Sequence, residues 1–348
     1  MKRALYAVVF LFAFMSMAWA QTGPNGENWT PAKQLFGYKP LPSVQTPASY
    51  GTYTRGCLAG GVAIAANGPT WQAMRLSRNR RWGHPTMIKV VERLSREAAE
   101  FDGWPGLLVG DISQPRGGPM VSGPASHQRG IDADIWLRPM PSKRFTFQER
   151  EQISAISVLK KGSFRVDDNI WTPAHGKLLK RAAGYPEVQR LFVHPGIKKK
   201  MCETYRGQSW MSKVRPWFGH HYHFHIRLGC LPGSTGCKRQ ATPPAGDGCA
   251  DLDYWFNIKL LGKDKKKSKG SGKPAKKPTR PRYRILSDLP AACSAVLAGP
   301  TPVSATDVTL QAGNWQETES WVFTEARRRK KRIPVTLPQS VTVLPRFR

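Results

Sequence analysis

Four histidines stand close together between Gly219 and Arg227, where they make up half of the eight histidines in the chain. Imidazole nitrogen is a common metal ligand in proteins, and zinc accepts it readily. Apolar residues alternate with two of the histidines as in a β-strand, so His223 and His225 are expected to point to one face. A metal site would explain the pattern, but an exposed histidine-rich edge strand or a chance cluster would give the same local sequence, so a partner sequence is needed to decide.

A second group of chemically active residues lies upstream, where His127 is followed seven positions later by Asp134. The pair Arg129-Gly130 predicts a turn, after which apolar residues alternate with polar ones as on a strand with one buried face. Asp132 and Asp134 would then share a face and repel each other near a core. A divalent cation would offset that cost, whereas a solvated strand face is the alternative.

Taken together, His127, Asp134 and His225 would offer two nitrogen ligands and one oxygen ligand. Structural zinc sites are normally closed by four protein ligands, whereas three His or carboxylate ligands plus water are typical of hydrolytic sites. The H-E-x-x-H motif of thermolysin-like enzymes is absent from the chain. The spacing therefore predicts a hydrolytic zinc site of another kind.

Several longer segments accompany the two histidine motifs in a recognisable order. Together with them, these segments resemble the penicillin-insensitive murein endopeptidases, within the group of lysostaphin and the D-Ala-D-Ala metallopeptidases. The resemblance covers the chain from Lys33 to Cys293. The segments that carry it are Leu35–Gly37, Gly56–Gly61, Met74–Pro85, Val109–Met120 and Lys213–His220.

This resemblance implies hydrolysis of peptide cross-links in peptidoglycan, of the D-Ala to meso-diaminopimelate type, in the periplasm. It makes His127, Asp134 and His225 the ligands of Zn2+, His223 the catalytic histidine and His220 a second active-site histidine. Because His220 would face away from His223 on a regular strand, the chain must turn or bulge near His220. Pro124 stands where some members of the family carry a further histidine, which puts an accessory metal site in doubt.

The helices and strands expected around these residues indicate a single α+β domain, with a mainly antiparallel central sheet flanked by helices. Helix-like spacing of apolar residues occurs over 85–101 and 173–183, and strands are expected around 131–137, 189–194 and 221–228. His84 is expected either to line the substrate cleft or to pack a loop. His175 and His194 are expected to be structural or surface residues.

Six cysteines, an even number, suit an oxidising compartment and permit 15 pairings. A turn-rich loop separates Cys230 from Cys237, so a local disulfide there would fix the end of the histidine strand. The family resemblance implies Cys57 with Cys293 and Cys202 with Cys249 as the other pairs. Metal binding by the cysteines is the alternative, but the C-x2-C spacing of structural zinc sites is missing.

The chain begins with Lys2 and Arg3, an apolar run to about residue 17, and Ala18-Trp19-Ala20. This pattern predicts a secretory signal peptide over residues 1–20. A retained membrane anchor is the alternative, but the run is shorter than the roughly 20 residues that a spanning helix needs. The endopeptidase domain is then expected over residues 21–297, without a transmembrane segment in the mature chain.

The formal net charge is +31, and much of it lies in two segments. Residues 263–284 mix basic residues with Pro, Gly and Ser, which predicts a flexible basic insert. A basic C-terminal extension is expected over 298–348. Such runs commonly bind nucleic acid, but export argues against that partner. The remaining alternatives are weak electrostatic contact with anionic envelope polymers, or a solvated tail with no partner.

Two functions of different classes remain from the sequence. The first is a zinc endopeptidase that acts on peptidoglycan, in which Arg116, Arg129 and Arg227 either grip a substrate carboxylate or serve as structural ion-pair partners. Without a serine nucleophile, β-lactams are not expected to acylate its site. The second is an exported, non-catalytic cell-wall-binding protein that contains a metal.

Overall fold

The computed structural model describes residues 28–260, 280–303 and 309–310. Its centre is a seven-stranded sheet in the order β10-β9-β11-β8-β7-β5-β4, with a two-stranded β1-β2 sheet and a three-stranded β12-β3-β6 sheet beside it. The strands are β1 (Ala48–Thr52), β2 (Arg55–Ala59), β3 (Val62–Ile64), β4 (Asn67–Gly68), β5 (Trp71–Ala73), β6 (Trp82–Gly83), β7 (Leu107–Val109), β8 (Asp132–Trp136), β9 (Val188–Val193), β10 (Val214–Pro216), β11 (His223–Leu228) and β12 (Thr309–Leu310).

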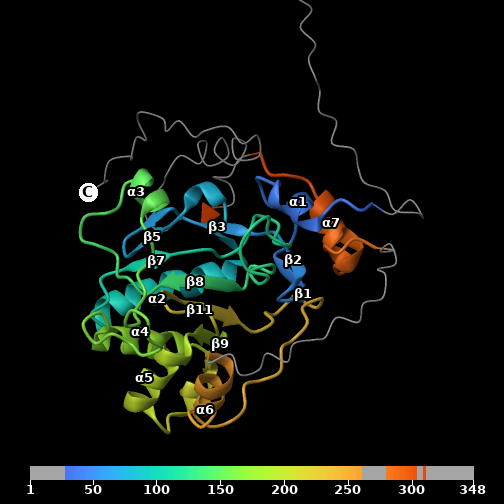
Figure 1. Ribbon diagram of the computed structural model, residues 1–348. Helices are drawn as coiled ribbons and strands as arrows, with labels where there is room; N and C mark the ends of the chain where they lie inside the picture. Colours follow the sequence, from blue (N-terminus) through green and yellow to red (C-terminus); the bar gives the residue numbers. More distant parts are fainter. Residues whose placement is uncertain (1–27, 261–279, 304–308, 311–348) are drawn as a thin grey trace, which may run out of the picture.

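Helices surround these sheets, with α1 and α7 together at one end and α4, α5 and α6 at the opposite side of the central strands (Figure 1). The α-helices are α1 (Ala32–Gly37), α2 (Pro85–Phe101), α3 (Phe147–Gln152), α4 (Pro173–Gly184), α5 (Pro195–Tyr205), α6 (Leu252–Tyr254) and α7 (Ala292–Ala298). Shorter or irregular turns of helix are η1 (Leu76–Arg78), η2 (Ser209–Lys213), η3 (Trp255–Leu260) and η4 (Leu286–Asp288).

Helix α2 shows how the sequence pattern becomes packing. The His84 side chain caps its N-terminus by accepting a hydrogen bond from the Thr86 amide, and Pro85 fits the first turn, where no amide donor is needed. Its buried positions recur at three- and four-residue spacing and join the main hydrophobic core with the inward faces of β7, β8, β9 and β11. The predicted helix over 85–101 is therefore confirmed.

The expectation of an α+β fold is confirmed, and the expectation of a mainly antiparallel central sheet is confirmed in part, because the sheet is mixed. Strand β10 pairs with β9 in parallel, and β5 pairs with β7 in parallel, whereas the other neighbours in this sheet are antiparallel. Parallel neighbours need a crossover connection. Helix α2 supplies one between β5 and β7, and α5 supplies the other between β9 and β10.

Three disulfides join Cys57 to Cys293, Cys202 to Cys249, and Cys230 to Cys237, so all three expected pairings are confirmed. The first ties β2 to α7 across 236 residues of sequence, and the last closes the loop that follows β11.

Among the described residues, no helix is long and apolar enough to cross a bilayer.

The Cys57–Cys293 disulfide is expected to contribute the most to stability. By the chain-entropy estimate, a loop of this length stabilises the fold by about 5 kcal/mol, against about 2 kcal/mol for the short Cys230–Cys237 loop. The Cys57→Ala/Cys293→Ala variant should therefore unfold at a clearly lower urea concentration than the Cys230→Ala/Cys237→Ala variant. Equal midpoints in the two variants would contradict this order.

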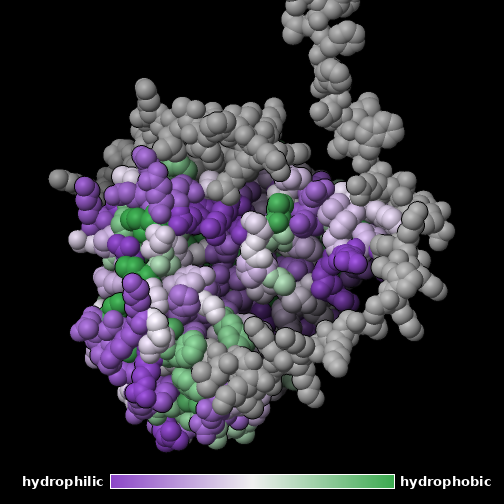
Figure 2. All heavy atoms as spheres, in the orientation of Figure 1, coloured by the Kyte–Doolittle hydropathy of each residue, from purple (hydrophilic) through white to green (hydrophobic). Residues whose placement is uncertain are grey.

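The face drawn in Figure 2 is predominantly hydrophilic, with small separate hydrophobic patches. The predicted signal peptide lies outside the described residues, and so do most of the predicted basic insert and of the C-terminal extension.

Candidate active site

The two predicted motifs lie on neighbouring strands. Strands β8 and β11 pair antiparallel, and their register places His225 directly opposite Asp134. Ile131, just before β8, and Ala133 and Ile135 within it are fully buried on the core side, as the alternation predicts. The carboxylates of Asp132 and Asp134 consequently lie on the other face, beside the histidines of β11.

His127 reaches the same place from the loop before β8. Its backbone has a φ of 65°, a left-handed conformation that is uncommon for a residue other than glycine. Gly130, with a φ of 66°, forms the predicted turn, and a Cβ there would lie 2.6 Å from Leu58 and 2.9 Å from the His84 amide nitrogen. The tight loop returns the fully buried His127 ring over Asp134.

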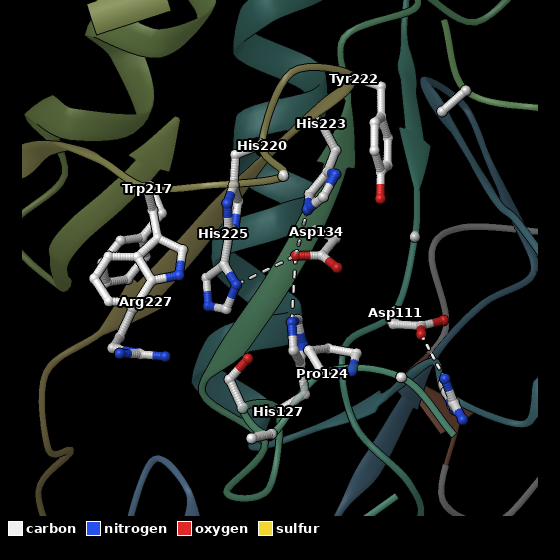
Figure 3. Close-up of a pocket in the computed structure, with 18 of the residues that line it drawn as sticks. Asp111, Pro124, His127, Asp134, Trp217, His220, Tyr222, His223, His225 and Arg227 are labelled. Atoms are coloured by element: carbon white, nitrogen blue, oxygen red, sulfur yellow. Dashed lines mark hydrogen bonds and ion pairs between the residues drawn. The ribbon is translucent and has the colours of Figure 1, made fainter. Parts of the chain in front are cut away.

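Three ligand atoms converge at this point. His127 Nε2 and His225 Nδ1 each lie 3.3 Å from Asp134 Oδ1, and suitable atoms of all three residues lie within 4.8 Å of one another (Figure 3). His127 Nε2 and Asp134 Oδ1 are buried without a hydrogen-bond partner. Buried polar atoms that lack partners are costly, and two nitrogens with one carboxylate oxygen are a donor set that zinc accepts well. The residues therefore fit a bound metal ion.

In His127 and His225, a hydrogen bond from one ring nitrogen decides which nitrogen keeps its lone pair for a metal ion. Nδ1–H of His127 donates to the Ile112 carbonyl at 2.9 Å, which leaves the Nε2 lone pair toward Asp134. Nε2–H of His225 donates to Asp132 Oδ1 at 2.7 Å, which leaves the Nδ1 lone pair toward Asp134. Such outer partners orient metal-binding histidines.

The electrostatics of the cluster favour positive charge beside Asp134, which a proton on His127 or a metal ion can supply. Burial lowers the pKa of His127, but attraction by Asp134 outweighs it and raises that pKa to about 9. Burial would raise the pKa of Asp134, whereas the charges of His127 and His223 hold it below the usual range. Burial, together with the neighbouring His127, lowers the pKa of His225 to about 4. Asp134 thus stays ionised and attracts positive charge.

Asp132 was not assigned a role from the sequence, and it holds the site together. Its side chain is fully buried, and Oδ1 accepts from both His225 Nε2 and Arg227 Nε, the latter at 2.6 Å. Burial would raise the pKa of Asp132, but Arg227 and His225 more than offset this and hold it well below the ordinary value. The only sequence signal was its shared strand face with Asp134.

The remaining histidines of the segment divide between the site and its surroundings. His223 Nε2 lies 3.6 Å from Asp134 Oδ1, and the His220 and His223 ring centroids are 4.8 Å apart. A turn over 218–221 brings His220 to this side, as expected, with Gly219 at a φ of 74°. His221 packs its ring against Tyr222 instead.

A cavity of about 1010 Å³ surrounds these side chains. His127, Asp134, His220, His223 and His225 all line it. On one side of Asp134 lie Tyr222 and Asp111, and on the other lie Trp217 and Arg227 (Figure 3). Pro124 also lines the cavity, and its side chain offers no metal ligand.

The three arginines that the sequence offers as candidates for binding a substrate carboxylate have structural roles. Arg116 is 1% exposed and donates to the backbone carbonyls of Val296, Leu297 and Gly299. Arg129 donates to the carbonyls of Gly51 and Lys238. Arg227 lines the cavity but is 4% exposed and paired with Asp132. Burial and internal acceptors therefore favour the structural alternative for all three.

The other described histidines are structural as well. His84 and His194 cap the N-termini of α2 and α5 by accepting hydrogen bonds from backbone amides. His175 is buried, with Nε2 bonded to the Leu137 carbonyl and its ring stacked on Trp171. None of the three lines the cavity.

Comparison with known proteins places this geometry in a family. Residues 49–298 match the family described as penicillin-insensitive murein endopeptidase. A protein of that name from Haemophilus influenzae is 44% identical over 221 residues, which cover 63% of this chain and 77% of the relative. Namesakes from Pectobacterium atrosepticum and Yersinia enterocolitica are 39% and 37% identical, and the matches cover 63% and 74% of this chain and 78% and 87% of those proteins. The chain belongs to the penicillin-insensitive murein endopeptidase family.

Proposed function

We propose that this chain is a zinc-dependent endopeptidase that hydrolyses peptide cross-links of peptidoglycan in the periplasm. The observation that carries the metal assignment is the convergence of His127 Nε2, Asp134 and His225 Nδ1, with two of the converging atoms buried and unpartnered. The names of the relatives supply the substrate class. The preferred cross-link in this proposal joins D-Ala to meso-diaminopimelate.

A zinc ion held by His127, Asp134 and His225 would polarise the scissile carbonyl and lower the pKa of a bound water to about 7. His223 would contact the reacting atoms, since its ring lies beside Asp134 and its Nδ1 is buried without a partner. In this role His223 donates a hydrogen bond to the developing oxyanion. His220 Nδ1 is bonded to the Phe218 carbonyl at 2.6 Å, which leaves Nε2 to accept a proton.

The domain assignment is also part of this proposal. Bonds from the buried Arg116 to carbonyls at 296, 297 and 299 support a catalytic domain that includes residue 297, although β12 also pairs with β3 beyond the proposed boundary. The cleaved signal peptide over 1–20 and the weak electrostatic contact of the basic insert and extension with anionic envelope polymers stand as predictions.

Metal removal tests the proposal directly. Purified mature protein should release monomers from cross-linked muropeptide dimers, lose this activity when a chelator removes the metal, and regain it with added zinc. Penicillin should leave the rate unchanged, because hydrolysis in this proposal uses no serine nucleophile. Absence of chelator-sensitive cleavage at every metal loading would favour the non-catalytic, cell-wall-binding alternative.

A further inference from the structure

One side of the cavity carries an arginine cluster formed by Arg75, Arg78 and Arg80, with Asp111 among them. Two of these arginines are held by the protein itself. Arg80 Nη1 lies 2.8 Å from Asp111 Oδ2, and its Nη2 donates to the Ser122 carbonyl. Arg75 Nη2 donates to the Ile153 carbonyl at 2.7 Å. Both therefore form part of the cavity wall.

Arg78 differs from its neighbours because its side chain is 40% exposed. Its Nη1 lies 3.4 and 3.5 Å from the two oxygens of Asp111, at the outer limit of a hydrogen bond. The nearer oxygen already accepts the short bond from Arg80. One carboxylate thus faces two guanidinium groups, which leaves an excess positive charge directed into the cavity.

The backbone presents Arg78 in a fixed position. Arg75 and Asn79, on either side of η1, both have left-handed backbones, with φ of 54° and 53°. The side-chain amide of Asn79 is held by two hydrogen bonds. Its Nδ2 donates to the Pro40 carbonyl, and its Oδ1 accepts from the Trp82 indole N–H. Strained backbone of this kind persists only where its surroundings hold it, and it is common at functional sites.

The arginine cluster is also close to the candidate metal ligands. The Asp134 amide donates to the Asp111 carbonyl at 3.0 Å, and the Gly110 amide donates to the Asp134 carbonyl at 2.7 Å. Asp111 and Tyr222 lie together on one side of Asp134 (Figure 3). A peptide that has its scissile bond at Asp134 and occupies the Asp111 side of the cavity would meet Arg78.

We propose that Arg78 binds a carboxylate of the stem peptide, and so selects substrates that carry this group beside the scissile bond. The inference rests on the proposed function. In a D-Ala to meso-diaminopimelate cross-link, the carbon attached to the scissile nitrogen carries a free carboxylate. A guanidinium group binds carboxylate through two parallel hydrogen bonds, which gives both strength and orientation. Asp111, which Arg80 anchors, lies against Arg78 at the cavity wall.

The test compares two muropeptide dimers that differ only at that carboxylate, one with the free acid and one with the amide. For Arg78→Gln, kcat/KM on the free acid should fall about 10-fold, mainly through KM, as expected for loss of one charge-assisted pair. On the amide it should change less than about 2-fold. Arg78→Lys should give an intermediate loss on the free acid, since it keeps the charge without the planar fork.

The matched control is Arg96→Gln, which removes an exposed arginine on α2 that does not line the cavity. It should leave both dimers unaffected. Equal losses on both dimers for Arg78→Gln, with wild-type chelator-sensitive turnover intact, would overturn the inference and leave the proposed function standing. If the wild type cleaves neither dimer, the proposed function fails. The inference about Arg78 is then tested by measuring how tightly the metal-free protein binds the free-acid dimer. Equal affinities of the wild type and Arg78→Gln for that dimer would overturn the inference.

Discussion

His225→Ala is expected to lose bound zinc and peptidoglycan hydrolysis together, whereas His223→Ala is expected to keep the zinc and lose hydrolysis. Both residues lie on β11 and both approach Asp134, so sequence spacing alone does not separate them. The separation comes from hydrogen bonding. His225 is fixed by Asp132 with Nδ1 turned toward Asp134, and the outer carboxylate makes it a stronger ligand.

Loss of an outer partner of a ligand weakens metal binding by about 10- to 100-fold. His225→Ala removes one of the three ligands themselves, so zinc binding should weaken by more than this factor. For His223→Ala, zinc content should remain near one per chain, while kcat falls by about 100- to 10,000-fold, the usual range for loss of an acid–base group. Zinc is measured by elemental analysis after gel filtration. Turnover is measured by chromatography of the muropeptide products.

His221→Ala is the matched control, because it removes a histidine of the same segment that does not line the cavity. This variant should retain both zinc and turnover. Equal zinc loss in His223→Ala and His225→Ala would refute the division of roles between the two residues. Full turnover in His223→Ala would remove that residue from the proposed chemistry.

Strand alternation and spacing predict which of the candidate ligands point to the same face. A two-residue period places His223 and His225 on one face, and the structure confirms it by bringing both rings to Asp134. The register between β8 and β11 is a long-range property that no local pattern specifies. The local patterns left this register open, and the family resemblance supplied the ligand assignment and two of the three disulfide pairings.

Local sequence patterns do not separate arginines that serve the fold from arginines that face the cavity. Arg116 and Arg129 donate to carbonyls far away in sequence, and such acceptors have no local signature. Arg78 stands in a motif that carries the resemblance, yet its exposure depends on the left-handed residues that flank η1. The parallel strand pairs were missed for a related reason, because crossover helices do not show which neighbour a short strand will choose.

Asp132→Asn is expected to lower the free energy of unfolding by about 3–5 kcal/mol, because it leaves a buried arginine without its counter-charge. Arg227 is 4% exposed, and its Nε–H donates to the same oxygen that accepts from His225. The asparagine keeps an oxygen acceptor but loses the negative charge. Zinc affinity should also fall by about 10- to 100-fold, since His225 loses the charged partner that orients it.

The double variant Asp132→Asn/Arg227→Met separates these two effects. The methionine side chain carries no charge, so no uncompensated charge remains. The Arg227 guanidinium carbon lies 4.3 Å from the ring centroid of Tyr53 and 4.9 Å from that of Phe192. The unbranched methionine should pack between the same two rings. Replacement of a buried ion pair by apolar groups is often nearly neutral, so urea unfolding should show the double variant more stable than Asp132→Asn alone. Its zinc affinity should remain as low as in that single variant, because His225 still lacks a carboxylate. The single variant Arg227→Met completes the comparison: if its effect on the unfolding free energy and that of Asp132→Asn sum to that of the double variant, the two residues are not coupled. If the double variant regains zinc affinity, Arg227 rather than Asp132 governs the orientation of His225.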